Sequence, residues 1–359
     1  MEAKILLEDG TVFTGNAEEP VDSVFGEIVF NTGMTGYQEI LTDPSYAGQI
    51  VVMTYPLIGN YGVNSDDTES NSIKPNALVV KEFSQTASNW KSSKTVTQYL
   101  TNNSTPAISG IDTRMLTKKI RNQGTMNCVV TTGEITDELA NRLKLYKFPS
   151  DIVSQVSRKD IEIIKGKKAK IGLIDLGIKT GIIRQVAAQG CEVHLLPWNI
   201  SSDEILKSGL DAVLFSNGPG DPKEVKETIK CAKELLGKIR IFGICLGHQV
   251  LALALGADTY KMKFGHRGSN HPVIDLRTNK VQITAQNHGY AVDTKSLPNN
   301  MKITHLNVND ETVEGFECRE YKIETVQFHP EAGPGPRDCN FIFENWVNSI
   351  GNEEKNAKG

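Results

Sequence analysis

A cysteine between two glycines is the first candidate for chemistry in this chain of 359 residues. Cys245 lies in the stretch FGICLGHQ, after the apolar run 239–244 and before the apolar segment 246–255. This pattern predicts a strand, a sharp turn and a helix, the cysteine version of the G-x-S-x-G elbow. The helix N-terminus would favour a thiolate, and the N–H of Leu246 would point to where an oxyanion forms. The alternative is a buried structural cysteine beside loop glycines.

A nucleophilic thiolate needs a base, and the base needs a group that orients it. Among seven histidines, His329 has the most suitable neighbours, because it follows the strand-like run 322–328. Pro330 stiffens the turn, and Glu331 could accept a hydrogen bond from the imidazole and fix its tautomer. A turn histidine is often merely solvated, so the assignment depends on the elbow cysteine elsewhere in the chain.

The other histidines and cysteines are expected to have structural roles. His248 would cap or pack near the elbow, and the rest are assigned to a glycine-rich loop (His266, His271), a substrate loop (His288) and strands (His194, His305). The six cysteines form no C-x-x-C pair, so we expect no disulfide framework and no metal site.

Composition limits the possible functions. The net charge is −4 and the pI is about 6.0, which argues against nucleic acid or an anionic membrane as the partner. No run approaches the roughly 20 apolar residues of a membrane-spanning helix, and the N-terminus does not resemble a signal peptide. We therefore expect a cytoplasmic protein.

The pattern of elements predicts two domains. Residues 1–147 look like a separate β-rich α/β domain, with a hairpin signal at Asp9-Gly10, and 148–169 look like a solvated linker. In 170–350 strands and helices alternate, which predicts a doubly wound, mostly parallel sheet, and 351–359 looks like a tail.

Ligands of such sheets bind at the carboxyl ends of the strands. One such end is the elbow, and another is the glycine-rich turn 216–221, where Gly218 could offer a second oxyanion donor. The run 172–180 nearly spells a phosphate-binding loop. It lacks the required Lys directly after the second Gly, because Ile178 intervenes, so ATP binding is not expected there.

Three motifs, GICLGHQ, SNGPGDP and FHPEA, together resemble those of class I glutamine amidotransferases, over residues 170–350. The stretches GEIVFNTGMTGYQEILTDPSYAGQIVVMTYPLIGNYG and IDTR, with KMKFGHRGSNHPV and QNHGYAVD, resemble the small-subunit family of carbamoyl phosphate synthetase. The resemblance covers nearly the whole chain. Two positions depart from the usual pattern, Gly181 where Asn is frequent and Gly333 where Ser is frequent, and neither belongs to the predicted triad.

The resemblance implies a Cys-His-Glu triad that hydrolyses glutamine to glutamate and ammonia. Cys245 would be the nucleophile, His329 the base and Glu331 its orienting group, with oxyanion N–H groups from Leu246 and Gly218. The implied glutamine-binding residues are Ser45, Gly218, Gly220, Leu246, Gln249, Asn287, Gly289 and Tyr290.

The family also implies a large-subunit partner, in a heterodimer or a higher oligomer, which makes carbamoyl phosphate from bicarbonate and ATP. No metal or cofactor is expected on this chain, and ATP and Mg²⁺ would bind the large subunit. Whether the product serves arginine or pyrimidine synthesis stays open.

Three other functions share part of this sequence pattern. An amidotransferase for anthranilate or GMP synthesis would lack the N-terminal domain, and a silent binding subunit would lack Cys245. A cysteine peptidase would share the thiolate–histidine chemistry, but no segment suggests a peptide groove.

Overall fold

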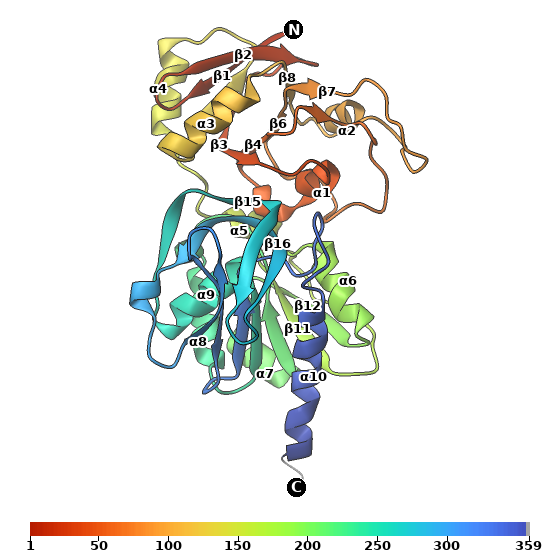
Figure 1. The fold of residues 1–359 in the computed structure, drawn as a ribbon, viewed down its shortest axis with the longest axis vertical. Helices are drawn as coiled ribbons and strands as arrows, with labels where there is room; N and C mark the ends of the chain where they lie inside the picture. The colour runs from red at the N-terminus through yellow and green to blue at the C-terminus, as the bar shows by residue number, and fades with distance from the viewer. Residues whose placement is uncertain (357–359) are drawn as a thin grey trace. The chain divides into compact units, whose positions relative to one another are not determined.

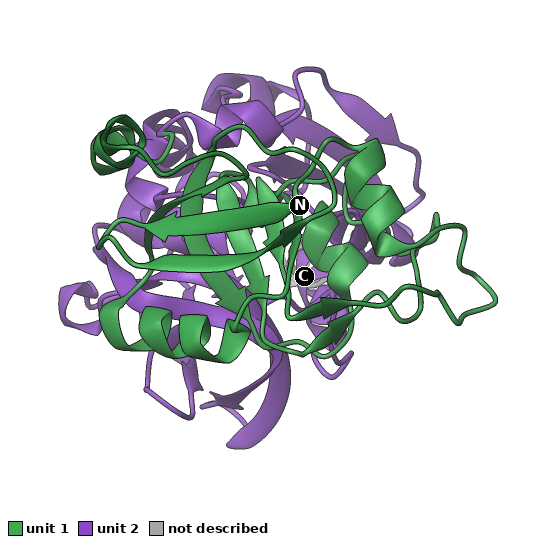
Figure 2. Cartoon of the chain, turned by 90° about the horizontal axis from the view of Figure 1, so that it is seen from above, with its two compact units in different colours: residues 1–149 green, residues 150–359 purple. Residues whose placement is uncertain are grey.

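The computed structural model describes residues 1–356 and divides into two compact units, residues 1–149 and the part that begins at Ser150 (Figures 1 and 2). The division falls at the start of the segment predicted as a linker. That segment contains regular structure, although much of it is exposed as predicted: helix α5 (Ile152–Val156) contributes the buried Val153 to the core of unit 2, and β10 (Glu162–Ile164) pairs with β12 (Glu192–Pro197).

Unit 1 is built on a closed barrel with the strand order β1-β2-β8-β6-β4-β3-β9. The predicted hairpin around Asp9-Gly10 is confirmed, because β1 and β2 pair antiparallel on either side of it. In β2 exposed and buried residues alternate, as expected for a strand with one face on the core. The barrel strands are β1 (Glu2–Leu7), β2 (Val12–Ala17), β3 (Val24–Asn31), β4 (Gln49–Met53), β6 (Ala77–Val79), β8 (Ala107–Ser109) and β9 (Met126–Thr131).

Short helices and a two-stranded sheet complete unit 1. The helices are α1 (Tyr37–Thr42), the 3-10 turn η1 (Pro44–Tyr46), α2 (Val96–Asn102), α3 (Thr113–Gln123) and α4 (Asp137–Leu145), and the small sheet pairs β5 (Leu57–Ile58) with β7 (Glu82–Phe83). Three of these helices begin at side-chain caps, Thr95, Asp112 and Thr136, each of which accepts a hydrogen bond from the backbone N–H three residues on.

Unit 2 contains one ten-stranded sheet in the order β10-β12-β11-β13-β14-β19-β18-β17-β15-β16. The five strands β12, β11, β13, β14 and β19 are parallel, and the remaining pairings are antiparallel. The predicted α/β class is confirmed, and the parallel strands form one half of a sheet that continues as an antiparallel half. The further strands are β11 (Lys170–Asp175), β13 (Ala212–Phe215), β14 (Arg240–Ile244), β15 (Thr259–Asp275), β16 (Lys280–Val292), β17 (Lys302–Asn307), β18 (Val313–Cys318) and β19 (Ile323–Val326).

Helices cover both faces of the parallel half, as a doubly wound sheet requires. One apolar cluster joins the sheet to α7 (Ser202–Lys207), α8 (Lys226–Leu235) and α9 (Leu246–Leu255). A second joins the other face to α6 (Thr180–Ala188) and α10 (Phe341–Asn356).

Local sequence signals mark the starts of two elements of unit 2. The capping box of Ser201 and Glu204 is present at the start of α7. Asp221-Pro222 begins a separate 3-10 turn, η2 (Pro222–Glu224), and the α-helix starts only at Lys226. The remaining 3-10 turn is η3 (Thr294–Ser296).

Two expectations from sequence were wrong. The segments around His266, His271 and His288, assigned to loops, form the long antiparallel hairpin of β15 and β16, in which His266 lies opposite His288. Their glycines do not end the strands: Gly265, whose φ is 68°, lies within one register shift, and Gly268 pairs with Gln286 directly before a second. The predicted tail begins as helix, since α10 continues to Asn356, and its last residues, 357–359, lie outside the described residues.

No helix within residues 1–356 is both long enough and apolar enough to cross a membrane.

Candidate active site

Cys245 occupies the predicted elbow between β14 and α9. It is the N-cap residue of α9, and its backbone has φ 53° and ψ −105°, a conformation that residues with a Cβ rarely adopt. Its N–H donates to the Val326 carbonyl at 2.9 Å, which ties the elbow to the end of β19. The backbone of the elbow is therefore strained and held in place by its neighbours, as observed at nucleophile elbows.

The two flanking glycines are required by close packing. A Cβ on Gly247 would lie 2.0 Å from the Phe215 carbonyl oxygen, and one on Gly243 would lie 2.7 Å from the Leu251 side chain. The Gly247 N–H also donates to the Ser216 carbonyl at 2.9 Å, so the elbow touches the glycine-rich turn after β13.

That turn also explains Gly218. A Cβ there would lie 2.1 Å from the Leu176 carbonyl oxygen and 2.8 Å from the Leu246 side chain. Gly218 therefore packs against the first residue of α9. The N–H of Leu246 belongs to the first turn of that helix, where N–H groups have no intrahelical partner. Gly218 and Leu246, the two residues predicted to donate to an oxyanion, are therefore in contact.

His329 and Glu331 form the second part of the site. His329 Nδ1 donates to Glu331 Oε1 at 2.7 Å, and both side chains are buried. The His329 N–H donates to the Ala285 carbonyl at 2.9 Å, which anchors the histidine to β16. Because Nδ1 is bound to the carboxylate, Nε2 is the ring atom available for proton transfer, and it has no hydrogen-bond partner among residues 1–356.

The electrostatics of this pair are coupled. Burial opposes the charged imidazolium, but the Glu331 carboxylate outweighs it and raises the pKa of His329. For Glu331 burial opposes ionisation, and the nearby cations Lys179 and His329 outweigh it and lower the pKa of the carboxyl group. The carboxylate therefore stays ionised beside the histidine.

Lys179 is a component of the site that sequence reasoning missed. Its Nζ lies 2.8 Å from Glu331 Oε1 and 2.8 Å from the Ala332 carbonyl oxygen, in a side chain only 3% exposed. Lys179 belongs to the run that nearly matches a phosphate-binding loop. Its partner in the structure is the carboxylate of Glu331, 152 residues further along the chain. The ion pair fixes the position of Glu331 and keeps it charged.

The thiol and the imidazole are neighbours without a well-formed hydrogen bond. The proximity of Cys245 contributes to the raised pKa of His329 after the larger effects of burial, Glu331 and Lys179. The Cys245 Sγ–H donates instead to the Asn287 carbonyl oxygen at 3.6 Å. Such pairs are often loose without substrate and tighten when the substrate binds.

Of the predicted glutamine-binding residues of unit 2, Asn287 contacts the thiol, and others lie on β16 and α9. Asn287, Gly289 and Tyr290 lie on β16, and Gln249 lies on α9 and donates its amide to Tyr290 O at 2.8 Å and to Gln327 Oε1 at 2.9 Å. The Gln249 nitrogen is thus committed within the protein, which leaves its carbonyl oxygen for a ligand.

Two further predicted residues lie in turns. Gly220 adopts φ 88° in the turn between β13 and η2, a conformation suited to glycine. Ser45 belongs to unit 1, where it lies in η1 and its N–H donates to Asp43 Oδ1 at 2.9 Å. A role for Ser45 in glutamine binding stays a prediction.

The arrangement can perform acyl transfer. It combines the thiol of Cys245, on a strained backbone at a helix N-terminus, with His329, which a carboxylate orients, and with backbone N–H groups where an oxyanion is predicted to form.

Comparison with known proteins identifies both units. Residues 5–130 match the family model of the CPSase domain of the carbamoyl-phosphate synthase small chain, and residues 172–349 match that of class I glutamine amidotransferases. The chain is 48% identical over 354 residues to the carbamoyl phosphate synthase small chain of Fusobacterium nucleatum subsp. nucleatum, covering 98% of this chain and 99% of the relative. It is 47% identical over 359 residues to the carbamoyl phosphate synthase pyrimidine-specific small chain of Bacillus subtilis, covering 100% and 98%.

Both family models together span most of the sequence, and both relatives match it over nearly their full length. The chain therefore belongs to the carbamoyl phosphate synthase small-chain family and carries a class I glutamine amidotransferase domain.

Proposed function

We propose that this chain is the glutaminase subunit of a carbamoyl phosphate synthase and that Cys245, His329 and Glu331 are its catalytic triad. The observation that carries the proposal is the strained backbone of Cys245 at the N-terminus of α9, with a buried, carboxylate-oriented His329 beside it.

In the first half-reaction the Cys245 thiolate attacks the side-chain carbonyl carbon of glutamine. The C–N bond breaks, and His329 Nε2 gives its proton to the leaving nitrogen, which departs as ammonia. A γ-glutamyl thioester remains on Cys245. His329 Nε2 then removes a proton from water, which attacks the thioester, and glutamate leaves as the thiol is restored. One difficult acyl transfer is thereby divided into two easier ones.

The tetrahedral oxyanion of each step needs donors placed in advance. The N–H groups of Leu246 and Gly218 are the proposed donors, and each such donor typically contributes about 3 to 4 kcal/mol of transition-state stabilisation. Glu331, held by Lys179, stabilises the imidazolium that forms when His329 accepts the thiol proton.

The names of the relatives motivate the rest of the proposal. A small chain implies a large chain as partner, and ammonia made here would pass to that chain for carbamoyl phosphate synthesis from bicarbonate and ATP, with Mg²⁺ and ATP bound there. One relative is named pyrimidine-specific. The carbamoyl phosphate would serve pyrimidine synthesis, arginine synthesis or both.

Competitive labelling tests the triad. All six cysteines are buried, so selective labelling would reflect activation of the thiol and access for the reagent. A glutamine-like electrophile should label Cys245 before the five others, and excess glutamine should protect it. Burial raises the pKa of Cys128, Cys231 and Cys339, which makes those thiols poor nucleophiles. Equal labelling of Cys245 and Cys339, or no protection by glutamine, would remove the thiolate assignment.

A further inference from the structure

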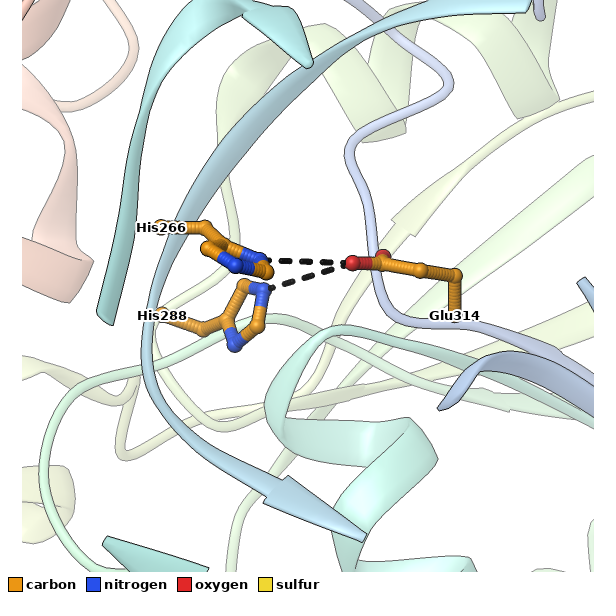
Figure 3. A group of neighbouring side chains, drawn as sticks. All are labelled: His266, His288 and Glu314. Carbon is orange, nitrogen blue, oxygen red and sulfur yellow. Dashed lines mark ion pairs between the residues drawn. The ribbon is translucent and has the colours of Figure 1, made fainter. Parts of the chain in front are cut away.

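Three buried side chains of unit 2 place potential metal ligands close together on the antiparallel half of the sheet (Figure 3). His266 comes from β15, His288 from β16 and Glu314 from β18. One ligand atom from each lies within 4.8 Å of the other two. Glu314 Oε1 is 3.4 Å from His266 Nδ1 and 4.0 Å from His288 Nε2.

The tautomer of His288 follows from its other contact. Its Nδ1 lies 2.7 Å from the Tyr290 carbonyl oxygen, which can only accept, so Nδ1 carries the hydrogen. In the neutral ring Nε2 therefore presents a lone pair. This atom is buried and has no hydrogen-bond partner in the described part of the chain, and it faces the Glu314 carboxylate. A cation between two acceptors that face each other away from water would stabilise both.

The surroundings of the other two side chains resemble the support of a metal site. His266 Nε2 donates to Asp310 Oδ2 at 2.8 Å, which leaves Nδ1 directed at Glu314. Gln286 Nε2 donates to Glu314 Oε2 at 2.8 Å, and Asn307 Nδ2 donates to Oε1 at 3.2 Å. Metal-binding histidines and carboxylates are characteristically oriented by such outer contacts.

We propose that His266 Nδ1, His288 Nε2 and Glu314 Oε1 bind a divalent transition-metal ion, with Zn²⁺ as the best match. Two imidazoles and one carboxylate suit zinc, whose bonds to such ligands are about 2.0 to 2.2 Å long. Tetrahedral bonds of that length place ligand atoms about 3.4 Å apart. The 3.4 Å between His266 Nδ1 and Glu314 Oε1 already has this value, and the 4.0 Å between His288 Nε2 and Glu314 Oε1 would have to shorten by about 0.6 Å.

The position suggests what the ion would do. His288 lies on β16 between Asn287 and Gly289, which belong to the proposed glutamine site, and Asn287 contacts the Cys245 thiol through its carbonyl oxygen. An ion bound to His288 would hold this strand to β15 and β18. The ion would thus fix the strand that is proposed to bind glutamine. That consequence rests on the proposed function, whereas metal binding itself does not depend on it.

The test uses the full chain carrying Cys245→Ser, which removes the active-site thiol as a competing ligand. Metal-stripped protein is titrated with Zn²⁺ and Co²⁺. We expect one ion per chain by elemental analysis, a melting temperature raised by about 5 °C or more at saturating Zn²⁺, and a tetrahedral Co²⁺ spectrum without a thiolate charge-transfer band.

Two ligand variants and one control make the assignment specific. Glu314→Gln keeps the side-chain volume, and His288→Asn keeps a donor for the Tyr290 carbonyl, so both should fold and lose the ion. His271→Asn is the control, because its ring lies 5.0 Å from that of His266 but supplies no ligand atom.

The proposal would be overturned if the protein bound no stoichiometric metal and Zn²⁺ did not raise its melting temperature. The close contact of His266 and Glu314 would then be explained by a proton on His266 Nδ1. Equal loss in His271→Asn, or a thiolate band with Co²⁺, would overturn the proposal too. Wild-type protein that binds the ion but releases no glutamate from glutamine would contradict the proposed function and leave the metal site standing.

Discussion

The strained backbone of Cys245 predicts that glycine at this position gives a more stable protein than alanine, which is the reverse of the usual order. At most positions a protein with glycine is less stable than one with alanine by about 0.5 to 1 kcal/mol, because glycine loses more backbone freedom on folding. Cys245 has φ 53° and ψ −105°, and a residue with a Cβ in a sparsely populated region costs about 1 to 3 kcal/mol. The difference predicts that Cys245→Gly is more stable than Cys245→Ala by about 1 kcal/mol, or roughly 2 to 4 °C in melting temperature.

Both variants lose the sulfur atom and its contacts, so their comparison isolates the backbone term. Thermal unfolding of the two purified variants under the same conditions measures it. The matched control is Cys231, a buried residue in the interior of α8. There Cys231→Gly should be less stable than Cys231→Ala by about 1 kcal/mol. If Cys245→Ala is the more stable variant at the elbow, the backbone there is not strained and the nucleophile-elbow reasoning is wrong.

Three further predictions follow from the site and its surroundings. Lys179→Met should raise the pKa values of Glu331 and His329, since Lys179 lowers both. The basic limb of the kcat/KM profile, where His329 loses the proton that it gives to the leaving nitrogen, should therefore shift upward by on the order of one pH unit, and an unchanged basic limb would contradict the role of the lysine. Burial disfavours a charged His266, but its carboxylate partners outweigh this and raise its pKa to about 9, so metal-free protein should keep the resulting stability below pH 6.5 and lose about 2 to 3 kcal/mol as the pH rises through 9. Denaturant unfolding at pH 6.5 and 9.5 checks this, and His266→Gln should abolish the difference. Gly218→Ala places a Cβ 2.1 Å from a backbone carbonyl oxygen, so glutamate release should fall at least tenfold, and wild-type kinetics would exclude Gly218 from the oxyanion site.

The local part of the site was predictable because its signals are contiguous in sequence. Cys245 stands between its strand and its helix, and His329 and Glu331 are two residues apart, so short-range rules of strand, turn and helix locate each group. The bond between His329 and Glu331 follows from that spacing. The carboxyl ends of β14 and β19, which are adjacent parallel strands, bring the two halves together.

The parts that were missed depend on contacts between distant segments. Lys179 reaches Glu331 across 152 residues, and no local pattern distinguishes it from an exposed lysine. The glycines near His266 indicated a loop, but paired strands tolerate them where bulges absorb the extra residues. The cluster with His288 and Glu314 exists only once β15, β16 and β18 assemble into one sheet, so sequence spacing could not reveal it.

The most direct test of the central claim is the rate of glutamate release from glutamine by Cys245→Ser in a complex reconstituted with a carbamoyl phosphate synthase large chain. The serine hydroxyl has a much higher pKa than a thiol, so release should fall by about a thousandfold or more. Carbamoyl phosphate synthesis supported by added ammonium should persist in the same sample. Glutamate release within tenfold of the wild-type rate, or an equal loss of both activities in a folded and associated complex, would contradict the account.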